Sequence, residues 1–411
     1  MGVRDDAEAI APELVGLRRA IHREPEIGLD LPGTQRKVLA ALDGLPLEIS
    51  LGTALSSVTA VLRGEGPAAL GGNAKDGDAK DGPVVLLRGD MDALPVAERT
   101  GLDYASQTAG VMHACGHDLH TAMLAGAARL LAARRRELPG TVVFMFQPGE
   151  EGHAGARHMI SEGVLDAAGQ RPVGAYALHV ASAEWPAGVF STRPGPMLAA
   201  AEVLAVTVHG HGGHGSEPHH AADPIPAACE MVTALQTLVT RRFDVFDPVV
   251  ITVGSFHAGT TDNVIPDDAT FLATVRSFSP EARDRVRESA LALVGGIATA
   301  HGLTVSAEFR DGYPVTVNDE AETRFAAGVV AGLLGEERCL AQPNPMTGAE
   351  DFSFVLEQVP GAFLMLGACP PGADPATAPN NHAADAVFDD SVLADGAALY
   401  AELALQRLAL S

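Results

Sequence analysis

The chain has 411 residues, of which 47% are apolar and 19% charged, so it is globular and long enough for two domains or one large α/β domain. Its 28 Lys and Arg against 52 Asp and Glu give a formal net charge of −24, which repels nucleic acid and anionic membranes. We therefore expect neither of these partners.

The first residues show no apolar core of a signal peptide, and Asp6 stands where a myristoylation signal needs Ser or Thr. No apolar run approaches the roughly 18 residues of a membrane span. The four cysteines have wide spacings that follow no disulfide pattern, which favours a reducing compartment: Cys115, Cys229, Cys339 and Cys369. We predict a cytoplasmic protein.

Apolar positions at helical spacing predict a first helix over 6–22 and a second over 34–42. His22, at the end of the first helix, is interpreted either as a functional group or as a cap for the last carbonyls. The segment from Gly71 to Gly82 has almost no apolar residue and predicts a mobile insertion at a hairpin tip.

Three buried strands are predicted over 84–87, 141–146 and 175–180, and each is followed or closed by acidic or imidazole groups. These groups are Asp90 and Asp92, Glu150 and Glu151, and His179. Cys115 and His117 lie between them in a short loop that opens a helix over 118–137. Open α/β sheets bind ligands at the carboxyl ends of their strands, so we expect these groups to converge there.

From Glu202 onward the predicted order is strand, helix, strand, strand, helix, strand, which is the ferredoxin-like order. We therefore predict a mixed, mostly parallel α/β domain, flanked by helices and interrupted by an α+β domain. The predicted boundaries are 1–194 and 310–411 for the α/β domain and 195–309 for the inserted one.

Thiolate, imidazole and carboxylate groups are the ligands of zinc and of other first-row metals. Five such groups exceed the needs of one tetrahedral ion, so they favour two ions about 3.5 to 4 Å apart, which would polarise a carbonyl and activate water. Each residue alone could be an unrelated core or surface group, but the convergence of the set favours a metal site. The predicted ligands are Cys115, His117, Glu151, His179 and His382.

Glu150 lies beside the predicted ligand Glu151, and a carboxylate that stays free of metal can act as a general base. Pro148 and Gly149 before the pair suit a tight loop. Asp92 and Asp118 are interpreted as acceptors that orient ligand histidines, or as ordinary acids.

The predicted inserted domain has a polar cluster of its own between His209 and His220. It is either a metal-scavenging tract or a shaped loop in which His214 stabilises an oxyanion. Asn263 and Arg276 belong to neighbouring strands and are candidate substrate-binding residues, although Arg276 could equally form a salt bridge at the sheet rim.

Several motifs in one order resemble the amidohydrolase branch of the M20 metallopeptidase family, which includes hippurate hydrolases, N-acyl-amino-acid deacylases and auxin-conjugate hydrolases. The resemblance spans most of the chain and rests on Arg88-Gly-Asp-Met-Asp-Ala-Leu-Pro95, Met112-His-Ala-Cys-Gly-His-Asp118, Gln147-Pro-Gly-Glu-Glu151, Ala177-Leu-His179, Gly212-Gly-His-Gly215 and Asn381-His382. The residues after His382 depart from the family pattern, in which Ser-Pro is commoner.

The resemblance implies that the five predicted ligands hold a pair of divalent ions, often manganese or zinc, with Glu150 as the general base. It also implies that the inserted domain is a lid or dimerisation domain. We therefore expect a homodimeric enzyme that hydrolyses the amide of N-acyl amino acids. The alternatives are a dipeptidase or aminopeptidase with the same metal chemistry, or a binding protein without catalysis.

Overall fold

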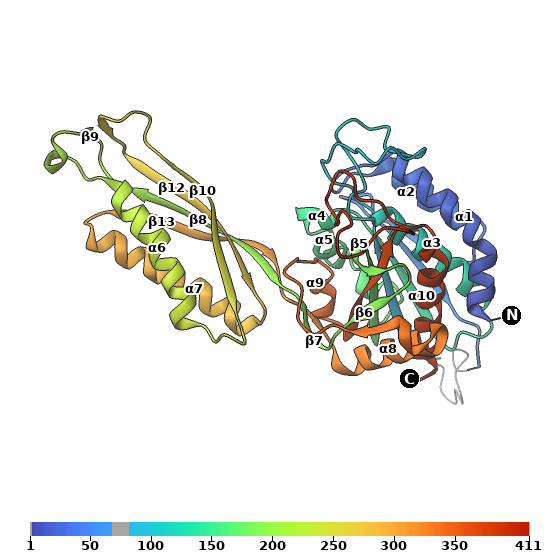
Figure 1. Cartoon of the computed structure of the whole chain (residues 1–411). Coiled ribbons are helices and arrows are strands. Elements are labelled where there is room, and N and C mark those ends of the chain that lie inside the picture. Colours follow the sequence, from blue (N-terminus) through green and yellow to red (C-terminus); the bar gives the residue numbers. More distant parts are fainter. Residues whose placement is uncertain (1, 68–81, 411) are drawn as a thin grey trace. The chain divides into compact units, whose positions relative to one another are not determined.

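The computed structural model describes residues 2–67 and 82–410. The predicted insertion lies outside the described residues except for Gly82. The chain forms two compact units (Figure 1): unit 1 comprises Met1–Gly195, Val317–Pro343 and Phe354–Ser411, and unit 2 comprises Pro196–Thr316 and Asn344–Ser353. The segment Asn344–Ser353 thus groups with unit 2, whereas the sequence alone assigned it to the α/β domain.

Unit 1 is built on an eight-stranded sheet with the order β1-β2-β4-β3-β5-β16-β6-β15. The four central strands are parallel to one another: β4, β3, β5 and β16. Strand β1 pairs antiparallel with β2, β2 pairs antiparallel with β4, and β6 pairs antiparallel with β16. This confirms the predicted mixed, largely parallel sheet. The strands are β1 (Glu48–Leu51), β2 (Val58–Arg63), β3 (Val84–Asp90), β4 (Thr141–Gln147), β5 (Gly174–Pro186), β6 (Phe190–Thr192), β15 (Cys339–Ala341) and β16 (Gly361–Cys369).

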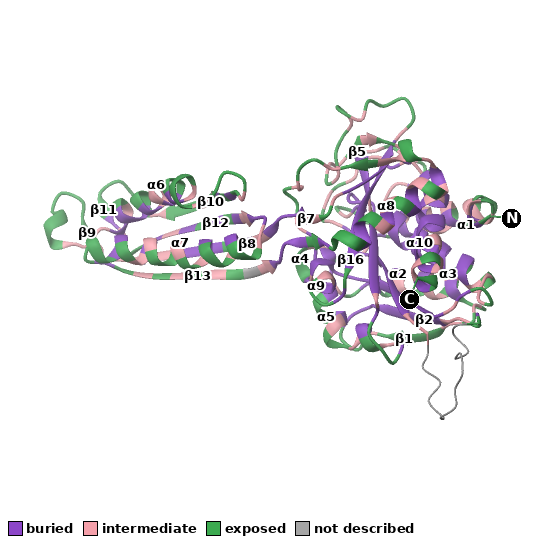
Figure 2. Ribbon diagram, turned by 90° about the horizontal axis from the view of Figure 1, so that it is seen from below, coloured by how far each residue is buried: buried purple, intermediate pink, exposed green. Residues whose placement is uncertain are grey.

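Helices cover both faces of this sheet (Figures 1 and 2). One face carries α1 (Val3–Arg23), α2 (Pro32–Leu42), α3 (His117–Ala133) and α10 (Val392–Ala409), and the other carries α4 (Glu150–His153), α5 (Gly155–Ser161) and α9 (Ser353–Leu356). Because helices bury the sheet from both sides, its central strands are continuous apolar runs. The remaining helical elements of unit 1 are α8 (Glu320–Leu334), η1 (Val164–Asp166) and η3 (Glu336–Arg338).

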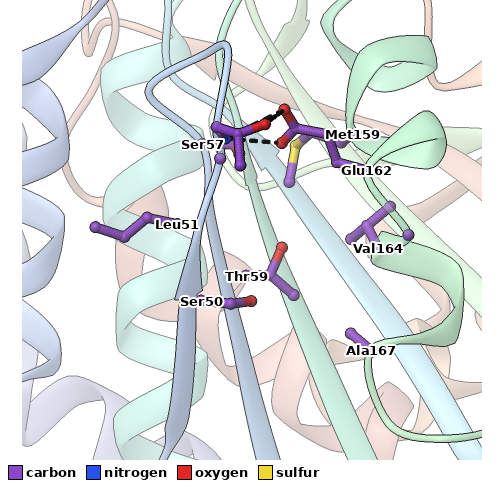
Figure 3. A pocket seen from close by; sticks show the side chains of 11 residues that line it. Ser50, Leu51, Ser57, Thr59, Met159, Glu162, Val164 and Ala167 are labelled. Carbon is purple, nitrogen blue, oxygen red and sulfur yellow. Dashed lines mark hydrogen bonds between the residues drawn. The ribbon is translucent and has the colours of Figure 1, made fainter.

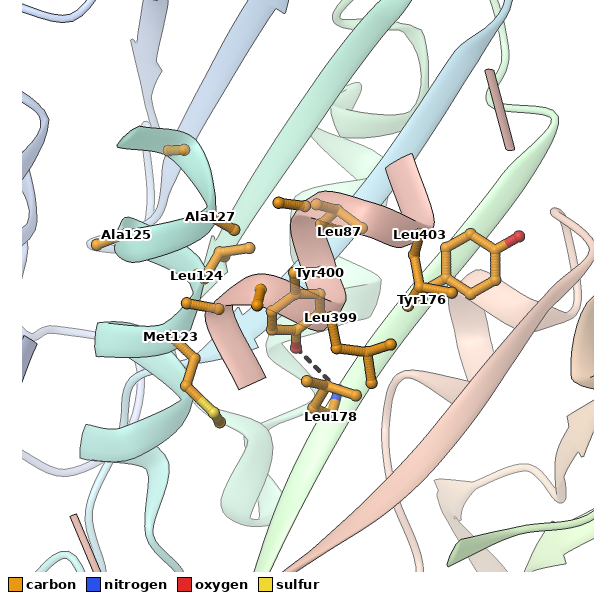
Figure 4. Close-up of a cluster of buried hydrophobic side chains, with 14 of the residues drawn as sticks. Leu87, Met123, Leu124, Ala125, Ala127, Tyr176, Leu178, Leu399, Tyr400 and Leu403 are labelled. Carbon is orange, nitrogen blue, oxygen red and sulfur yellow. Dashed lines mark hydrogen bonds between the residues drawn. The ribbon is translucent and has the colours of Figure 1, made fainter. Parts of the chain in front are cut away.

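The core of unit 1 lies between the sheet and the α3 and α10 pair (Figure 4). Tyr400 of α10 is fully buried there, and its hydroxyl donates to the Arg88 carbonyl at 2.5 Å and accepts from the Leu178 amide at 2.8 Å. One side chain thereby bonds to the backbones of β3 and β5, the strands whose ends deliver candidate site residues.

Unit 2 contains a four-stranded antiparallel sheet with the order β10-β12-β8-β13. Its elements follow the β-α-β-β-α-β order, and the buried residues of one sheet face pack with α6 and α7. The elements are β8 (Ala200–His209), α6 (Pro224–Arg242), β10 (Val249–Ala258), β12 (Asp268–Ser277), α7 (Pro280–Ala300) and β13 (Thr304–Tyr313).

Two short ladders complete the strand pairing: β9 (Gly213–His214) with β11 (Val264–Ile265), and β7 (Gly195–Leu198) with β14 (Thr316–Asn318). A 3-10 helix, η2, spans Pro218–His220. Across residues 2–67 and 82–410, no helix is both long and apolar enough to cross a membrane.

Candidate metal centre

Cys115 and His117 are held by the sharp turn that opens α3. Gly116 between them has φ +83°, and a Cβ there would lie only 2.3 Å from Val180 Cγ2. A side chain at this position would thus be strained by its backbone and would also collide with β5. The turn places Cys115 Sγ 3.4 Å from His179 Nε2 and 3.3 Å from His382 Nε2.

Backbone carbonyls fix the ring orientation of two predicted ligand histidines. His117 Nδ1 lies 2.9 Å from the Asp92 carbonyl oxygen, and His179 Nδ1 lies 2.9 Å from the Val180 carbonyl oxygen. A carbonyl can only accept, so each Nδ1 is the donor and each neutral ring keeps its lone pair on Nε2. His117 Nε2 is buried and has no hydrogen-bond partner within the described part of the chain. Such a nitrogen is ready to bind a metal ion.

The Glu150-Glu151 turn is held by Asp92. Asp92 Oδ1 accepts from the Glu150 amide at 2.9 Å, and Oδ2 accepts from the Glu151 amide at 3.0 Å. The sequence interpretation has Asp92 orient a ligand histidine. The Asp92 carbonyl accepts from His117 Nδ1, Asp92 Oδ1 lies 3.5 Å from the same nitrogen, and the carboxylate also organises the acidic turn. Glu151 Oε1 then lies 3.1 Å from His382 Nε2.

The structure brings all five predicted ligands and Glu150 into three overlapping groups whose donor atoms lie within 4.8 Å of one another. The mixed thiolate, imidazole and carboxylate set fits a divalent first-row metal ion. Cys115 belongs to two of the groups, as a ligand shared by two ions would. The groups are Cys115, His117 and His179; Cys115, Glu151 and His382; and His117, Glu150 and Glu151.

A further group, of Asp90, His117 and His120, does not fit a metal ion. His120 Nδ1 lies 2.5 Å from Asp90 Oδ1, and His120 Nε2 accepts from the Val180 amide at 2.8 Å. Both ring nitrogens of His120 are therefore already used. Asp90 also accepts from Arg88 at 2.7 Å, so this group joins β3 to α3 as a structural network.

The electrostatics of the cluster favour an ionised thiol. Burial alone would raise the pKa of Cys115, but the imidazoles of His179 and His117 outweigh it and hold the pKa well below its usual range. Hydrogen bonds to Cys115 and Glu151 raise the pKa of His382 to about 10. The thiolate is the form of cysteine that binds metal.

Asn381 joins three segments of the site, a role that only its place next to His382 could have suggested beforehand. Its Nδ2 donates to the Val180 carbonyl at 2.9 Å and to the Cys115 carbonyl at 3.3 Å, and its Oδ1 accepts from the Ser182 amide at 2.9 Å. His382 has φ +71°, an uncommon conformation for a residue with a side chain, and its amide donates to the Ala114 carbonyl. Asn381 therefore holds the strained loop that presents His382.

Asp118 lies apart from the ligand histidines. Its Oδ2 accepts from Arg18 Nε at 2.7 Å and faces His22 Nδ1 at 2.8 Å. The sequence interpretation has Asp118 accept a hydrogen bond from a ligand histidine, but the described residues contain no such bond. His22 is likewise bonded to carboxylates by its side chain, through Asp118 and Glu98, rather than to the last carbonyls of its helix.

In unit 2, His214 and Asn263 lie together because β9 pairs with β11 and the Gly215 amide donates to the Asn263 carbonyl at 2.9 Å. His214 is exposed, and its Nδ1 accepts from Ser216. Arg276 lies farther along β12, opposite Val250, and burial lowers its pKa. Within the described chain Arg276 has no ion-pair partner, and the histidines of the 209–220 segment form no group of three metal donors.

A pocket elsewhere in unit 1 carries no such chemistry (Figure 3). Ser57 and Thr59 of the β2 region line it with Met159 and Glu162. Glu162 accepts from the amides of Thr53 and Ala54, so its carboxylate holds the β1–β2 connection.

Residues 86–406 match the family model of peptidase family M20/M25/M40. The chain belongs to this family. It is 35% identical to thermostable carboxypeptidase 2 of Saccharolobus solfataricus over 98% of both chains. It is 36% identical to N-acetylcysteine deacetylase of Bacillus subtilis over 88% of this chain and 89% of the relative.

A solved structure gives the same assignment. The Bacillus subtilis YXEP protein, a dinuclear metal binding peptidase from the M20 family, superposes with a TM-score of 0.81 and 31% identity. The match covers 98% of this chain and 99% of that one. The M20 chain described here is thus a metal-dependent hydrolase of C–N bonds, and its donor cluster suits divalent ions.

Proposed function

We propose that this M20 hydrolase cleaves the amide bond of N-acyl amino acids to a carboxylate and a free amino acid. The proposal rests on the three overlapping donor groups, two of which contain Cys115 and the third of which contains Glu150 and Glu151. The similarity to N-acetylcysteine deacetylase supports an N-acyl amino acid as substrate.

In this proposal the five ligands hold two divalent ions, manganese or zinc: Cys115, His117, Glu151, His179 and His382. Ions bound there supply Lewis acidity to the carbonyl oxygen and lower the pKa of water. The place of Cys115 in two donor groups and the lone pairs left on His117 Nε2 and His179 Nε2 support this assignment.

Glu150 is the proposed general base. Asp92 fixes the backbone of both glutamates, Glu151 faces His382, and Glu150 lies within 4.8 Å of the donor atoms of His117 and Glu151. Glu150 takes the proton of the attacking water as the oxygen adds to the acyl carbon. It then gives that proton to the leaving nitrogen as the C–N bond breaks.

Unit 2 is proposed to contact the substrate. Arg276 is half-buried without a carboxylate partner in the described chain, and a guanidinium presents a planar fork that matches a free carboxylate. With Asn263 it would recognise the amino acid carboxylate, and His214 would stabilise the oxyanion. We also propose a cytoplasmic homodimer that pairs through unit 2.

A peptidase is the second candidate, because the chain resembles thermostable carboxypeptidase 2 and the YXEP peptidase. The dipeptidase or aminopeptidase version requires an acidic group that recognises a free α-amine. Protein reconstituted separately with manganese, zinc, cobalt and nickel should be assayed on N-acetyl and N-benzoyl amino acids beside free and N-blocked dipeptides. Faster turnover of N-acyl amino acids supports the proposal, whereas a strict need for a free α-amine contradicts it.

A further inference from the structure

A buried arginine on α1 joins segments that are far apart in the sequence. Arg18 is fully buried, and its Nε donates to Asp118 Oδ2 at 2.7 Å. Its Nη1 donates to Asp390 Oδ1 at 2.9 Å and to the Tyr104 hydroxyl at 2.6 Å. The guanidinium also lies over the Tyr104 ring, with the central carbon 4.7 Å from the ring centroid.

His22, one helical turn after Arg18, closes the same network. Its Nδ1 faces Asp118 Oδ2 at 2.8 Å, and its Nε2 faces Glu98 Oε1 at 3.3 Å. The His22 and Tyr104 rings meet edge to face with centroids 5.4 Å apart. Two cationic side chains of α1 therefore converge on the one carboxylate of Asp118.

Stability alone does not explain this network. Taking charged groups out of water is costly, and an ion pair in the interior often does no better than apolar side chains of similar volume. The network is also incomplete, because Arg18 Nη2 and Asp118 Oδ1 are buried without a hydrogen-bond partner in the described residues. Unsatisfied buried polar atoms are unfavourable, so the arrangement calls for a role other than packing.

The two carboxylates that Arg18 binds belong to the segments that present two proposed ligands. Asp118 directly follows His117 at the start of α3, and Asp390 ends the loop that begins at His382. That loop is otherwise irregular, and His382 itself has a positive φ. Arg18 therefore links α3 to a strained loop, and Arg19 Nε adds a second bond from α1 to Asp390 Oδ2 at 2.8 Å.

We propose that Arg18 is a positioning residue for the metal centre, which it fixes by holding Asp118 and Asp390 in one geometry. His22 supports it by keeping Asp118 oriented. The inference rests on the proposed ligand set, since it assigns Arg18 to the placement of His117 and His382. Its fixed fork binds two carboxylates at once, which the point charge of a lysine ammonium cannot reproduce.

The test measures metal binding directly. Apo-protein is titrated with Zn²⁺ or Mn²⁺ against a chromogenic chelator for the parent, Arg18→Lys and Asp390→Asn, and the melting temperature of each apo form is recorded. Loss of an outer partner of metal ligands typically weakens metal affinity about 10- to 100-fold, and we expect that loss in both variants. Asp390→Asn weakens the link from α1 to the His382 loop, including a bond from Arg19 Nε to Asp390 Oδ2 at 2.8 Å, and spares the Arg18–Asp118 pair. It therefore remains informative if Arg18→Lys fails to fold.

Arg407→Lys is the matched control. Arg407 also binds a carboxylate, Glu322, through Nε at 3.0 Å and a backbone carbonyl, that of Val173, through Nη2 at 3.1 Å. It lies in the same unit, and these two partners are outside the proposed ligand set. Its variant should lower the melting temperature without changing metal affinity.

Cys115→Ser separates this inference from the ligand assignment. If Cys115→Ser weakens metal binding while Arg18→Lys and Asp390→Asn bind metal as the parent does, the positioning role is refuted and the ligand set stands. If Cys115→Ser binds metal normally, the ligand set itself is refuted. Equal weakening in Arg407→Lys would show a general stability effect and would also overturn the positioning role.

Discussion

At the scale of single residues, two adjacent glutamates receive different proposed roles because one carboxylate, Asp92, binds both of their amides. The backbone geometry then lets Glu151 approach His382 while Glu150 remains buried in the same cluster. The two side chains have equal chemistry, so isosteric substitution of each is an informative test.

Glu150→Gln should retain metal and lose about 10² to 10⁴ in kcat, the usual contribution of a general acid-base group. Glu151→Gln is its matched partner and should lose metal. Steady-state kinetics and metal analysis of both purified variants check the assignment. If Glu150→Gln loses its metal while Glu151→Gln keeps it, the two roles are reversed.

Cys115→Ser should weaken metal affinity with a smaller effect on the fold, because a hydroxyl is a poorer ligand than a thiolate and occupies similar space. In the parent, chelator should abolish hydrolysis and added divalent metal should restore it. Competition titration and thermal melting of the variant provide the two readouts. Full activity in parent protein that elemental analysis shows to be metal-free would refute metal dependence.

At the scale of secondary-structure elements, the approach of α3 to β5 is set by a turn that only glycine fits. Gly116 combines a positive φ with a close contact to Val180 and Phe388. The turn therefore couples the position of Cys115 and His117 to the strand that carries His179. A methyl group at this point should affect folding and metal binding together.

Gly116→Ala should lower the free energy of unfolding by about 2 to 4 kcal/mol, from the positive φ and from overpacking against β5. Gly110→Ala is the matched control, since Gly110 has φ +76° and a Cβ added there would meet no atom within 4 Å in the described chain. The control should lose about 1 to 2 kcal/mol, the cost of the backbone conformation alone. Urea unfolding of the apo forms measures the free energy of unfolding of both variants. Equal decreases in the two variants would mean that β5 moves to accept the added methyl group without a loss of stability.

At the scale of the whole molecule, the proposed function assigns different chemistry to the two units. Unit 1 gathers the metal donors, whereas unit 2 supplies an arginine without a counterion in the described chain and a pair of exposed polar residues on β9 and before β11. A hydrolase selective for N-acyl amino acids needs both a reaction centre and a means of recognising the free carboxylate.

Arg276→Ala should cost about 1.5 to 3 kcal/mol in kcat/KM, the scale of a hydrogen bond to a charged group. The loss should appear with an N-acyl amino acid and be small with its methyl ester or amide, because only the free acid offers a carboxylate. Comparison of kcat/KM for these substrates in parent and variant checks this. A variant that discriminates as sharply as the parent places carboxylate recognition elsewhere.

Pairing of two chains through unit 2 should appear as a dimer in sedimentation at micromolar concentration. Strands β10 and β13 are the two edges of its sheet, and β10 exposes Val250 and Phe256. Exposed edge strands can pair across a twofold axis. A monomer at that concentration would contradict pairing but would leave the catalytic proposal intact.

Several features could be predicted from the sequence because each depends on short-range patterns. The apolar run of β3 ends in Asp90, that of β4 is followed by Glu150 and Glu151, and parallel strands bring such ends to one edge. This suffices to predict the largely parallel sheet and to group Cys115 with His117. Strand β16 and helix α10 were not predicted, because nearly every residue in them is apolar or small and shows neither a strand nor a helix period.

Only the tertiary structure decided which polar groups bind one another. The sequence gives Asp92 and Asp118 the same interpretation, as acceptors that orient ligand histidines. In the structure, Asp92 organises the glutamate turn and Asp118 binds Arg18. His120 resembles a ligand until both of its ring nitrogens are found in hydrogen bonds. The physical reason is that motifs specify donor types within a few residues, whereas hydrogen bonds form between side chains that the packing of α1, α3 and β5 brings together across the chain.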